Sequence, residues 1–131
     1  MENTGIMGLA EAVAARNDIE TRKGFLGFGK KLIYTPTGSR LKRCHEEYSA
    51  DNGARLESLL NMTAAERKAE ADKGERIAAS PNGNVCLDYY RTDDGRFVVA
   101  QLCRFNHFSY EPAAEAQTFK DDDAEALLRL I

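Results

Sequence analysis

The stretch that decides the fold covers residues 85–105 and reads VCLDYYRTDDGRFVVAQLCRF. Apolar and polar residues alternate on both sides of the central TDDGR, a period that is typical of half-buried β-strands. Gly95 favours the left-handed conformation that a short hairpin turn requires. A three-residue loop ending at Gly95 would pair Tyr89 with Val99. The sequence therefore predicts a β-hairpin whose odd-numbered positions face the core.

The same register places two of the three cysteines. If Val85 pairs with Cys103, then Cys86 points to the opposite face from Cys103, and we expect no disulfide between them. Cys44 brings the number of cysteines to three, which is odd, and the chain has no Cys-x-x-Cys pair. This pattern predicts free thiols in a reducing compartment. We expect no metal site and no cofactor.

The bulk composition fits one α+β domain. The chain has 131 residues, of which 43% are hydrophobic and 30% charged, enough for one core. We therefore expect a single domain over residues 1–131. No apolar run approaches the length of a membrane span, and residues 1–4 lack the basic-then-apolar layout of a signal peptide. These features predict a cytoplasmic protein that makes no contact with a membrane.

Helical spacing of apolar residues recurs outside the hairpin. An opening helix is predicted over residues 6–13, with Asn3 or Thr4 as its cap, and a second helix starts at Ser39 and is interrupted at Asp51–Gly53. A third helix is predicted from the capping box at Thr63 to about Ala79. A terminal helix begins in the acidic run Asp121–Asp123. The acids of that run are interpreted as helix caps and dipole compensation rather than as a catalytic carboxylate pair.

The helix from Ser39 depends on Leu41, Cys44, His45 and Tyr48, which would share one helical face. Strand composition recurs at residues 31–35 and again at 116–119. Together with the hairpin, these segments predict an antiparallel sheet of three to four strands with helices packed mainly on one face.

Basic residues are concentrated in one part of the chain. Residues 16–45 contain eight bases and two acids, although the whole chain has a net charge of −3. Such a segment suits phosphates, an acidic partner or the acidic remainder of its own fold. Its glycines and aromatic residues would add close backbone approach and base stacking. The predicted partner- or phosphate-binding residues are Arg22, Lys23, Phe25, Phe28, Lys30, Lys31, Arg40, Lys42 and Arg43.

Part of this segment, residues 24–30, matches the G-x-x-x-x-G-K portion of a phosphate-binding P-loop. Lys31 follows, however, where a P-loop requires a Ser or Thr that holds magnesium. The preceding residues 17–23 are polar and do not form the buried strand that this motif needs. We therefore do not expect nucleotide hydrolysis.

Other catalytic and metal-binding patterns are weak. Cys103-x-x-x-His107 is the one spacing of interest, and zinc sites usually show tighter pairs of ligands. His107 follows the hairpin and is the more exposed of the two histidines in this interpretation. No nucleophile elbow or triad surrounds it.

The C-terminal pattern Tyr110-x-Pro112-x-x-Glu115-Ala116-x-x-Phe119-x-x-x-Asp123-Ala124-Glu125-x-Leu127 resembles the end of many small proteins that phages and other mobile elements encode. In those proteins a short strand ending in Ala-x-x-Phe runs into a terminal helix. The resemblance implies an accessory protein that acts by binding, such as an inhibitor of a bacterial defence system. It carries over no functional residue, because the matching positions are structural.

Three hypotheses follow. The first is a non-catalytic protein that binds a protein partner, as a phage or mobile-element accessory factor or inhibitor. The second is a nucleic-acid-binding protein that uses the basic segment 22–43. The third is a small enzyme that uses His107 or a cysteine. A homodimer formed through an open sheet edge is compatible with each of them.

Overall fold

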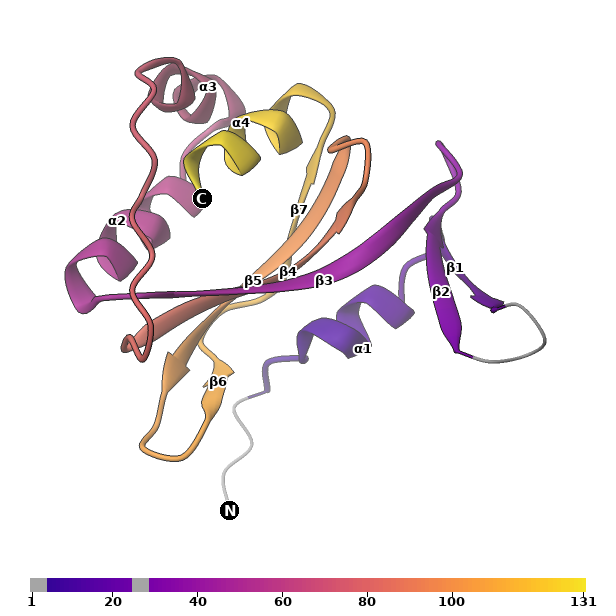
Figure 1. Ribbon diagram of the computed structural model, residues 1–131, viewed down its shortest axis with the longest axis horizontal. Coiled ribbons are helices and arrows are strands. Elements are labelled where there is room, and N and C mark those ends of the chain that lie inside the picture. Colours follow the sequence, from indigo (N-terminus) through magenta and orange to yellow (C-terminus); the bar gives the residue numbers. More distant parts are fainter. Residues whose placement is uncertain (1–4, 25–28) are drawn as a thin grey trace.

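The computed structural model describes residues 5–24 and 29–131, which form seven antiparallel strands and four helices (Figure 1). In chain order these are α1 (Leu9–Ala14), β1 (Ile19–Lys23), β2 (Lys30–Tyr34), β3 (Ser39–Tyr48), α2 (Ala50–Leu60), α3 (Ala64–Asp72), β4 (Val85–Thr92), β5 (Phe97–Phe105), β6 (Tyr110–Pro112), β7 (Gln117–Lys120) and α4 (Asp122–Leu130). The predicted α+β class is confirmed, whereas the prediction of three to four strands was too small.

The strands follow chain order across the sheet from β1 to β5, and both β6 and β7 pair with β5. Helices α2, α3 and α4 lie on one face of the sheet, and α1 lies on the other (Figure 1). We call these the helix-covered face and the α1 face. None of the described helices is both long and apolar enough to cross a membrane.

The central hairpin is confirmed, but its register differs from the predicted one by a single residue. The connection takes four residues, 93–96, and the hydroxyl of Thr92 accepts hydrogen bonds from the N–H groups of Arg96 and Phe97, both at 3.1 Å. Val99 therefore pairs with Tyr90 and not with Tyr89. Because a one-residue slip turns every side chain of a strand to the other face, odd positions of β4 share a face with even positions of β5.

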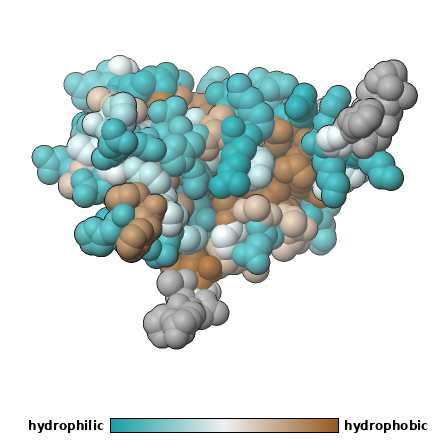
Figure 2. Space-filling view, turned by 60° about the horizontal axis from the view of Figure 1, so that its bottom comes forward, coloured by the Kyte–Doolittle hydropathy of each residue, from teal (hydrophilic) through white to brown (hydrophobic). Residues whose placement is uncertain are grey.

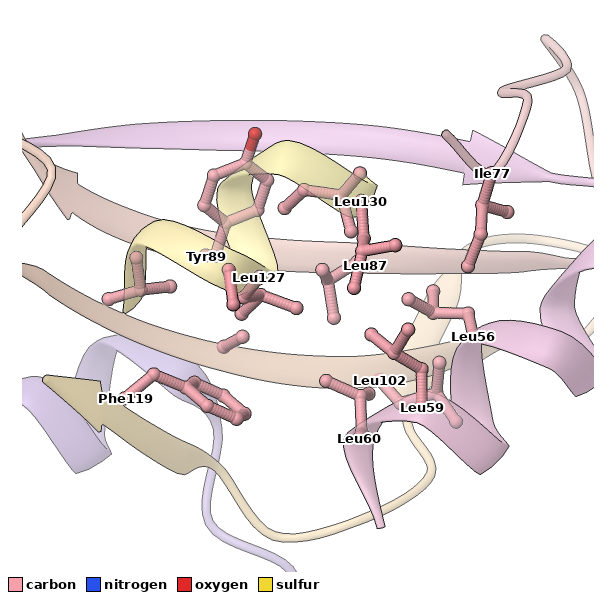
Figure 3. Close-up of a cluster of buried hydrophobic side chains, with 14 of the residues drawn as sticks. Leu56, Leu59, Leu60, Ile77, Leu87, Tyr89, Leu102, Phe119, Leu127 and Leu130 are labelled. Carbon is pink, nitrogen blue, oxygen red and sulfur yellow. The ribbon is translucent and has the colours of Figure 1, made fainter. Parts of the chain in front are cut away.

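The larger core fills the space between the sheet and the three helices of the helix-covered face (Figure 3). Leu87 of β4 and Leu102 of β5 meet leucines of α2 and α4 there, and Phe119 of β7 closes one side. Leu56 and Leu127 are fully buried. Burying one such side chain stabilises the fold by about 1.5–3 kcal/mol, so this core holds the helices on the sheet.

A second, smaller core lies on the α1 face. Leu9 and Val13 of α1 pack against the sheet, where the ring of Tyr34 stacks on that of Phe97 with centroids 4.1 Å apart. Val99, on the same face, is also buried. Strand β5 is therefore covered on both sides over its first half, which explains its continuous apolar run.

The predicted helix from Ser39 is wrong, because residues 39–48 form β3, the longest strand. Leu41 and His45 point to the α1 face, while Cys44 and Tyr48 contribute to the core on the helix-covered face. The apolar positions that fit one helical stripe are thus divided between two faces of a strand. Pairing with both β2 and β4 outweighs the local helical spacing.

The predicted helix break at Asp51–Gly53 is also wrong. Helix α2 runs through it, and the Ser49 hydroxyl caps the helix by accepting from the Asn52 N–H at 3.2 Å. A Cβ atom on Gly53 would lie 2.7 Å from a methyl carbon of Val85. The glycine is therefore explained by the close approach of α2 to β4 and not by a turn.

The capping box at Thr63 is confirmed. The Thr63 hydroxyl accepts from the Glu66 N–H at 3.1 Å, and the Glu66 carboxylate accepts from the Thr63 N–H at 2.9 Å. The helix ends at Asp72 rather than near Ala79, because Gly74 adopts a left-handed φ of 78°.

Two predicted strands and the opening helix are also found in the structure. Strand composition at 31–35 and 116–119 corresponds to β2 and β7, and these predictions are confirmed. The opening helix begins at Leu9, and its predicted caps, Asn3 and Thr4, lie outside the described residues.

The acidic run lies in the first turn of α4, as dipole compensation requires, but the predicted cap at Asp121 is wrong. The side chain of Asp121, at the N-cap position, makes no capping hydrogen bond. Asp123 accepts two hydrogen bonds from the guanidinium of Arg67, at 2.7 and 3.0 Å. Arg67 is only 5% exposed, and its guanidinium also lies over the Phe119 ring, 4.8 Å from the centroid. The ion pair therefore ties α3 to α4 and β7.

Replacing Asp123 with alanine would leave a buried guanidinium without its carboxylate. We expect Asp123→Ala to lower the free energy of unfolding by about 3 kcal/mol, measured by urea denaturation. Asp122→Ala is the matched control, because that side chain is 86% exposed, and it should change stability by about 0.5 kcal/mol or less. Equal losses in the two variants would show that the acids act through the helix dipole instead.

Candidate functional site

The predicted basic residues lie mostly on an arm, which we define as β1, β2 and residues 39–43 of β3. The arm lies at the end of the sheet away from α2 and α3 (Figure 1). Direct cross-strand partners share a face of the sheet, and Arg22 pairs with Lys31 while Lys42 pairs with Arg91 of β4. Alternation along β3 adds Arg40 to the same face.

We call this surface the basic face; it consists of Arg22, Lys31, Arg40, Lys42 and Arg91. Its first four members are exposed. Arg22 bonds to Glu20 on the same strand. Within residues 5–24 and 29–131, Lys31, Arg40 and Lys42 take part in no ion pair. The structure therefore gathers four of the predicted binding residues, and adds Arg91, into one positively charged surface.

The remaining predicted residues are not on this face. Lys23 and Lys30 pair with each other and point to the opposite side of the arm. Arg43 lies on the α1 face, 3.7 Å from the carboxylate of Asp88 and over the ring of Tyr90. Phe25 and Phe28 lie outside the described residues, so the predicted base stacking stays a prediction.

A second group of polar side chains lies on the α1 face at the centre of the sheet. We call it the thiol–imidazole cluster; its members are His45 and Glu47 of β3, Cys86 and Asp88 of β4, and Cys103 of β5. The register brings them together, because His45 pairs with Asp88, Glu47 with Cys86, and Cys86 with Cys103.

His45 lies between two carboxylates. Its Nδ1 is 2.6 Å from an oxygen of Asp88, and its Nε2 is 2.7 Å from an oxygen of Glu47. Burial alone would lower the pKa of His45, but the hydrogen bonds with Glu47 and Asp88 outweigh it and raise the pKa above its ordinary value. The hydrogen bonds from His45 and from the N–H of Asn82 lower the pKa of Glu47. A charged imidazolium thus holds both acids in place.

The two thiols of the cluster are buried and belong to directly opposed residues of β4 and β5. Cys86 is 0% and Cys103 is 3% exposed. A mutual hydrogen bond, together with burial, raises the pKa of Cys86, and the same hydrogen bond lowers the pKa of Cys103. The Cys103 sulfur also lies 3.7 Å from Asp88. Both cysteines are free thiols in the structure, as expected, but the prediction that they face opposite sides was wrong.

The cluster opens to the surface through a pocket of about 250 Å³ beside α1. Asp88, Cys103, Arg43, Gln101 and Tyr110 are among its lining residues. Donor atoms of His45, Cys86 and Asp88 all lie within 4.8 Å of one another. These residues therefore form a set that could hold a metal ion, although the sequence spacing predicted none.

The enzyme hypothesis named His107 or a cysteine. His107 lies in the exposed β5–β6 loop with a positive φ of 87°, and its side chain makes no hydrogen bond or ion pair with the described residues. Asp88 contacts both His45 and the Cys103 sulfur, and among the described residues His45 makes no hydrogen bond to a thiol. The geometry lacks the direct nucleophile–base contact of thiol catalysis.

Sequence reasoning missed the cluster because it depends on pairing. Residues 45 and 47 come from a segment with helical spacing, and residues 86 and 103 meet only in the observed register. The one local signal was alternation of polar residues with buried ones, as in Cys86-Leu87-Asp88.

Comparisons with protein-family models, curated proteins and solved structures gave no match. The geometry of the basic face and of the thiol–imidazole cluster is therefore the basis for a proposed function.

The raised pKa of His45 predicts how stability changes with pH. The imidazolium faces Asp88 and Glu47, the ring of Tyr110 lies edge-on at 5.5 Å, and Arg43 lies on the other side of Asp88's carboxylate as its ion-pair partner at 3.7 Å. A group whose pKa is higher in the folded state contributes its full stability below its unfolded value, here 6.5, and loses it as pH rises through the folded value.

We therefore expect wild type to exceed His45→Gln in stability by more at pH 6 than at pH 9. Urea denaturation at both pH values, with a chelator present, measures this difference. His107→Gln is the control and should show no such trend. A difference that grows with pH would contradict the geometry of the imidazolium.

Proposed function

We propose that the protein is a non-catalytic, cytoplasmic binding protein whose basic face docks onto an acidic surface of a protein partner. The observation that supports this is the position of Lys31, Arg40 and Lys42, which are exposed on one face without an ion pair among the described residues. Complementary charge of this kind steers association and selects partners. The C-terminal resemblance is compatible with an accessory factor of a phage or mobile element.

Two simpler explanations account for only part of the positive charge. Lysines on edge strands prevent sheet-to-sheet aggregation, and Lys23 of β1 fits that role. Arg40 and Lys42 lie on β3, which is paired on both sides, so edge protection does not explain them. Pairing with the chain's own acids explains Arg16 and Arg43, which contact Asp18 and Asp88.

A protein partner suits the rest of the surface better than a nucleic acid. Nucleic-acid-binding domains are usually strongly basic, whereas this chain has a net charge of −3 and a pI of about 5.4. The acidic remainder of the surface would repel a long polyanion such as a nucleic acid. A local acidic patch on a protein would contact only the arm.

The apolar surface is too scattered to dominate binding. The exposed large hydrophobic side chains of the described residues are Met7, Phe105 and Phe108. Figure 2 turns the bottom of Figure 1 toward the reader and shows a mostly hydrophilic surface with separate apolar areas. The proposed interface is therefore driven by charge rather than by a hydrophobic groove.

Charge reversal on the two sides of the arm tests this proposal. Lys31→Glu with Arg40→Glu changes the basic face, and Lys23→Glu with Lys30→Glu changes net charge equally on the opposite face. We expect the first double variant to lose at least tenfold in affinity for the protein captured by wild type. The second should bind like wild type, and circular dichroism should show that both remain folded.

Gel-shift titrations with single- and double-stranded DNA and RNA separate the two classes of partner. We expect no shift at physiological salt. A shift that weakens steeply with added salt, and that disappears in the first double variant only, would replace the protein partner with a nucleic acid. Equal losses in the two double variants would exclude the basic face as the binding site.

A further inference from the structure

Four metal-binding side chains converge on the α1 face from three adjacent strands. His45 comes from β3, Cys86 and Asp88 from β4, and Cys103 from β5. Their backbone positions are set by the central pairs of the sheet, so the set is built on rigid elements rather than on loops. Donor atoms of the first three lie within 4.8 Å of one another, the Cys103 sulfur lies 3.7 Å from Asp88, and Cys103 is the cross-strand partner of Cys86.

These separations are close to those of a tetrahedral zinc site. Zinc bonds of about 2.0–2.3 Å place neighbouring ligand atoms about 3.3–3.8 Å apart. Adjustments of about 1 Å therefore bring the donors of His45, Cys86 and Asp88 into coordination. The Cys103 sulfur lies 3.7 Å from Asp88 but outside that group of three, so its side chain moves further to complete the site. Two sulfurs, an imidazole and a carboxylate are a donor set that favours zinc over magnesium or calcium, which prefer oxygen ligands.

The surroundings of His45 match a metal-bound histidine. Such a histidine usually donates its second ring N–H to a carboxylate, which fixes the orientation of the ring. Here Nε2 lies 2.7 Å from Glu47, and Glu47 is itself held by the Asn82 N–H at 2.6 Å. Nδ1, which lies 2.6 Å from Asp88, is then the nitrogen left for the metal.

We propose that His45, Cys86, Asp88 and Cys103 bind one Zn²⁺ ion in a closed, structural site, with Glu47 as the positioning residue for His45. Both thiols, and Nδ1 of the His45 imidazolium, release their protons to solvent when the ion binds, since zinc coordinates thiolates and neutral imidazole. Two thiolates and one carboxylate then carry one negative charge more than the ion neutralises. Arg43, 3.7 Å from Asp88, balances that charge.

The site would join β3, β4 and β5 across the sheet. Four protein ligands leave no open position for a substrate, so the role of the metal is to stabilise the fold. This proposal is independent of the basic face, whose residues point to the other side of β3.

Metal binding to the untagged, reduced protein tests the proposal. After chelator treatment and dialysis against Zn²⁺, we expect one zinc per chain and a higher thermal midpoint than with EDTA. Co²⁺, used as a spectroscopic probe, should show the charge-transfer absorption of thiolate ligands. Binding of less than a tenth of an equivalent, or a cobalt spectrum without thiolate absorption, would overturn the proposal.

Variants assign the ligands. His45→Gln, whose side chain is 44% exposed in wild type, should stay folded and lose about 100-fold or more in Zn²⁺ affinity, as should Cys86→Ser and Cys103→Ser. Glu47→Gln should lose about 10- to 100-fold. Cys44→Ser and His107→Ala are matched controls outside the cluster and should bind zinc like wild type. If either control loses as much affinity as His45→Gln, the metal is bound elsewhere and the proposal fails.

Discussion

The pairing register of β4 and β5 is the constraint on which the rest of the structure depends. The N–H of Phe105 donates to the carbonyl of Asn84 at 2.9 Å, which makes these two residues a hydrogen-bonded pair. Because such pairs alternate along an antiparallel ladder, Cys86 and Cys103 are also a hydrogen-bonded pair, and Leu87 and Leu102 are not. A slip of one residue would exchange the faces of all these side chains.

Both cores and the thiol–imidazole cluster follow from this register. Leu87 and Leu102 share the helix-covered face, where they meet α2 and α4, while Phe97 and Val99 are left for the smaller core under α1. The cysteines then meet in the one part of the α1 face where His45 and Asp88 are also found. Strand β3 extends beyond this region and carries Arg40 and Lys42 to the arm, where its pairing with β2 and β4 positions the basic face.

Much of the fold could be predicted from the sequence, because turns, caps and apolar spacing depend on residues that are close together in the chain. The hairpin and the helix after Thr63 carry their own turn and cap chemistry, and β2, β7 and the terminal helix carry the apolar spacing of a strand or a helix. The strand β3 could not be predicted in this way. Its apolar residues fit a helix as well as a strand, and only its partners on both sides decide between them. Gly53 is similar, because its closeness to Val85 is a tertiary fact.

The two candidate sites likewise differ in how far the sequence predicted them. Charge segregation in residues 16–45 is visible in the sequence, and it indicated four of the five members of the basic face. Their separation from Lys23, Lys30 and Arg43 required the strand register. The thiol–imidazole cluster could not be predicted, because the predicted three-residue turn puts Cys86 and Cys103 on opposite faces of the sheet. The observed four-residue connection puts them on the same face. One residue in the length of a loop therefore decides whether the chain has a cluster of metal-binding side chains.

The most direct test of the account is the register itself, measured by nuclear Overhauser contacts between Hα protons across β4 and β5. Short Hα–Hα contacts occur at the pairs that are not hydrogen-bonded, where the strands approach most closely. The account predicts them between Leu87 and Leu102 and between Tyr89 and Ala100. Contacts between Tyr89 and Val99 instead would contradict it, because the cysteines would then face opposite sides of the sheet and the cluster would not exist.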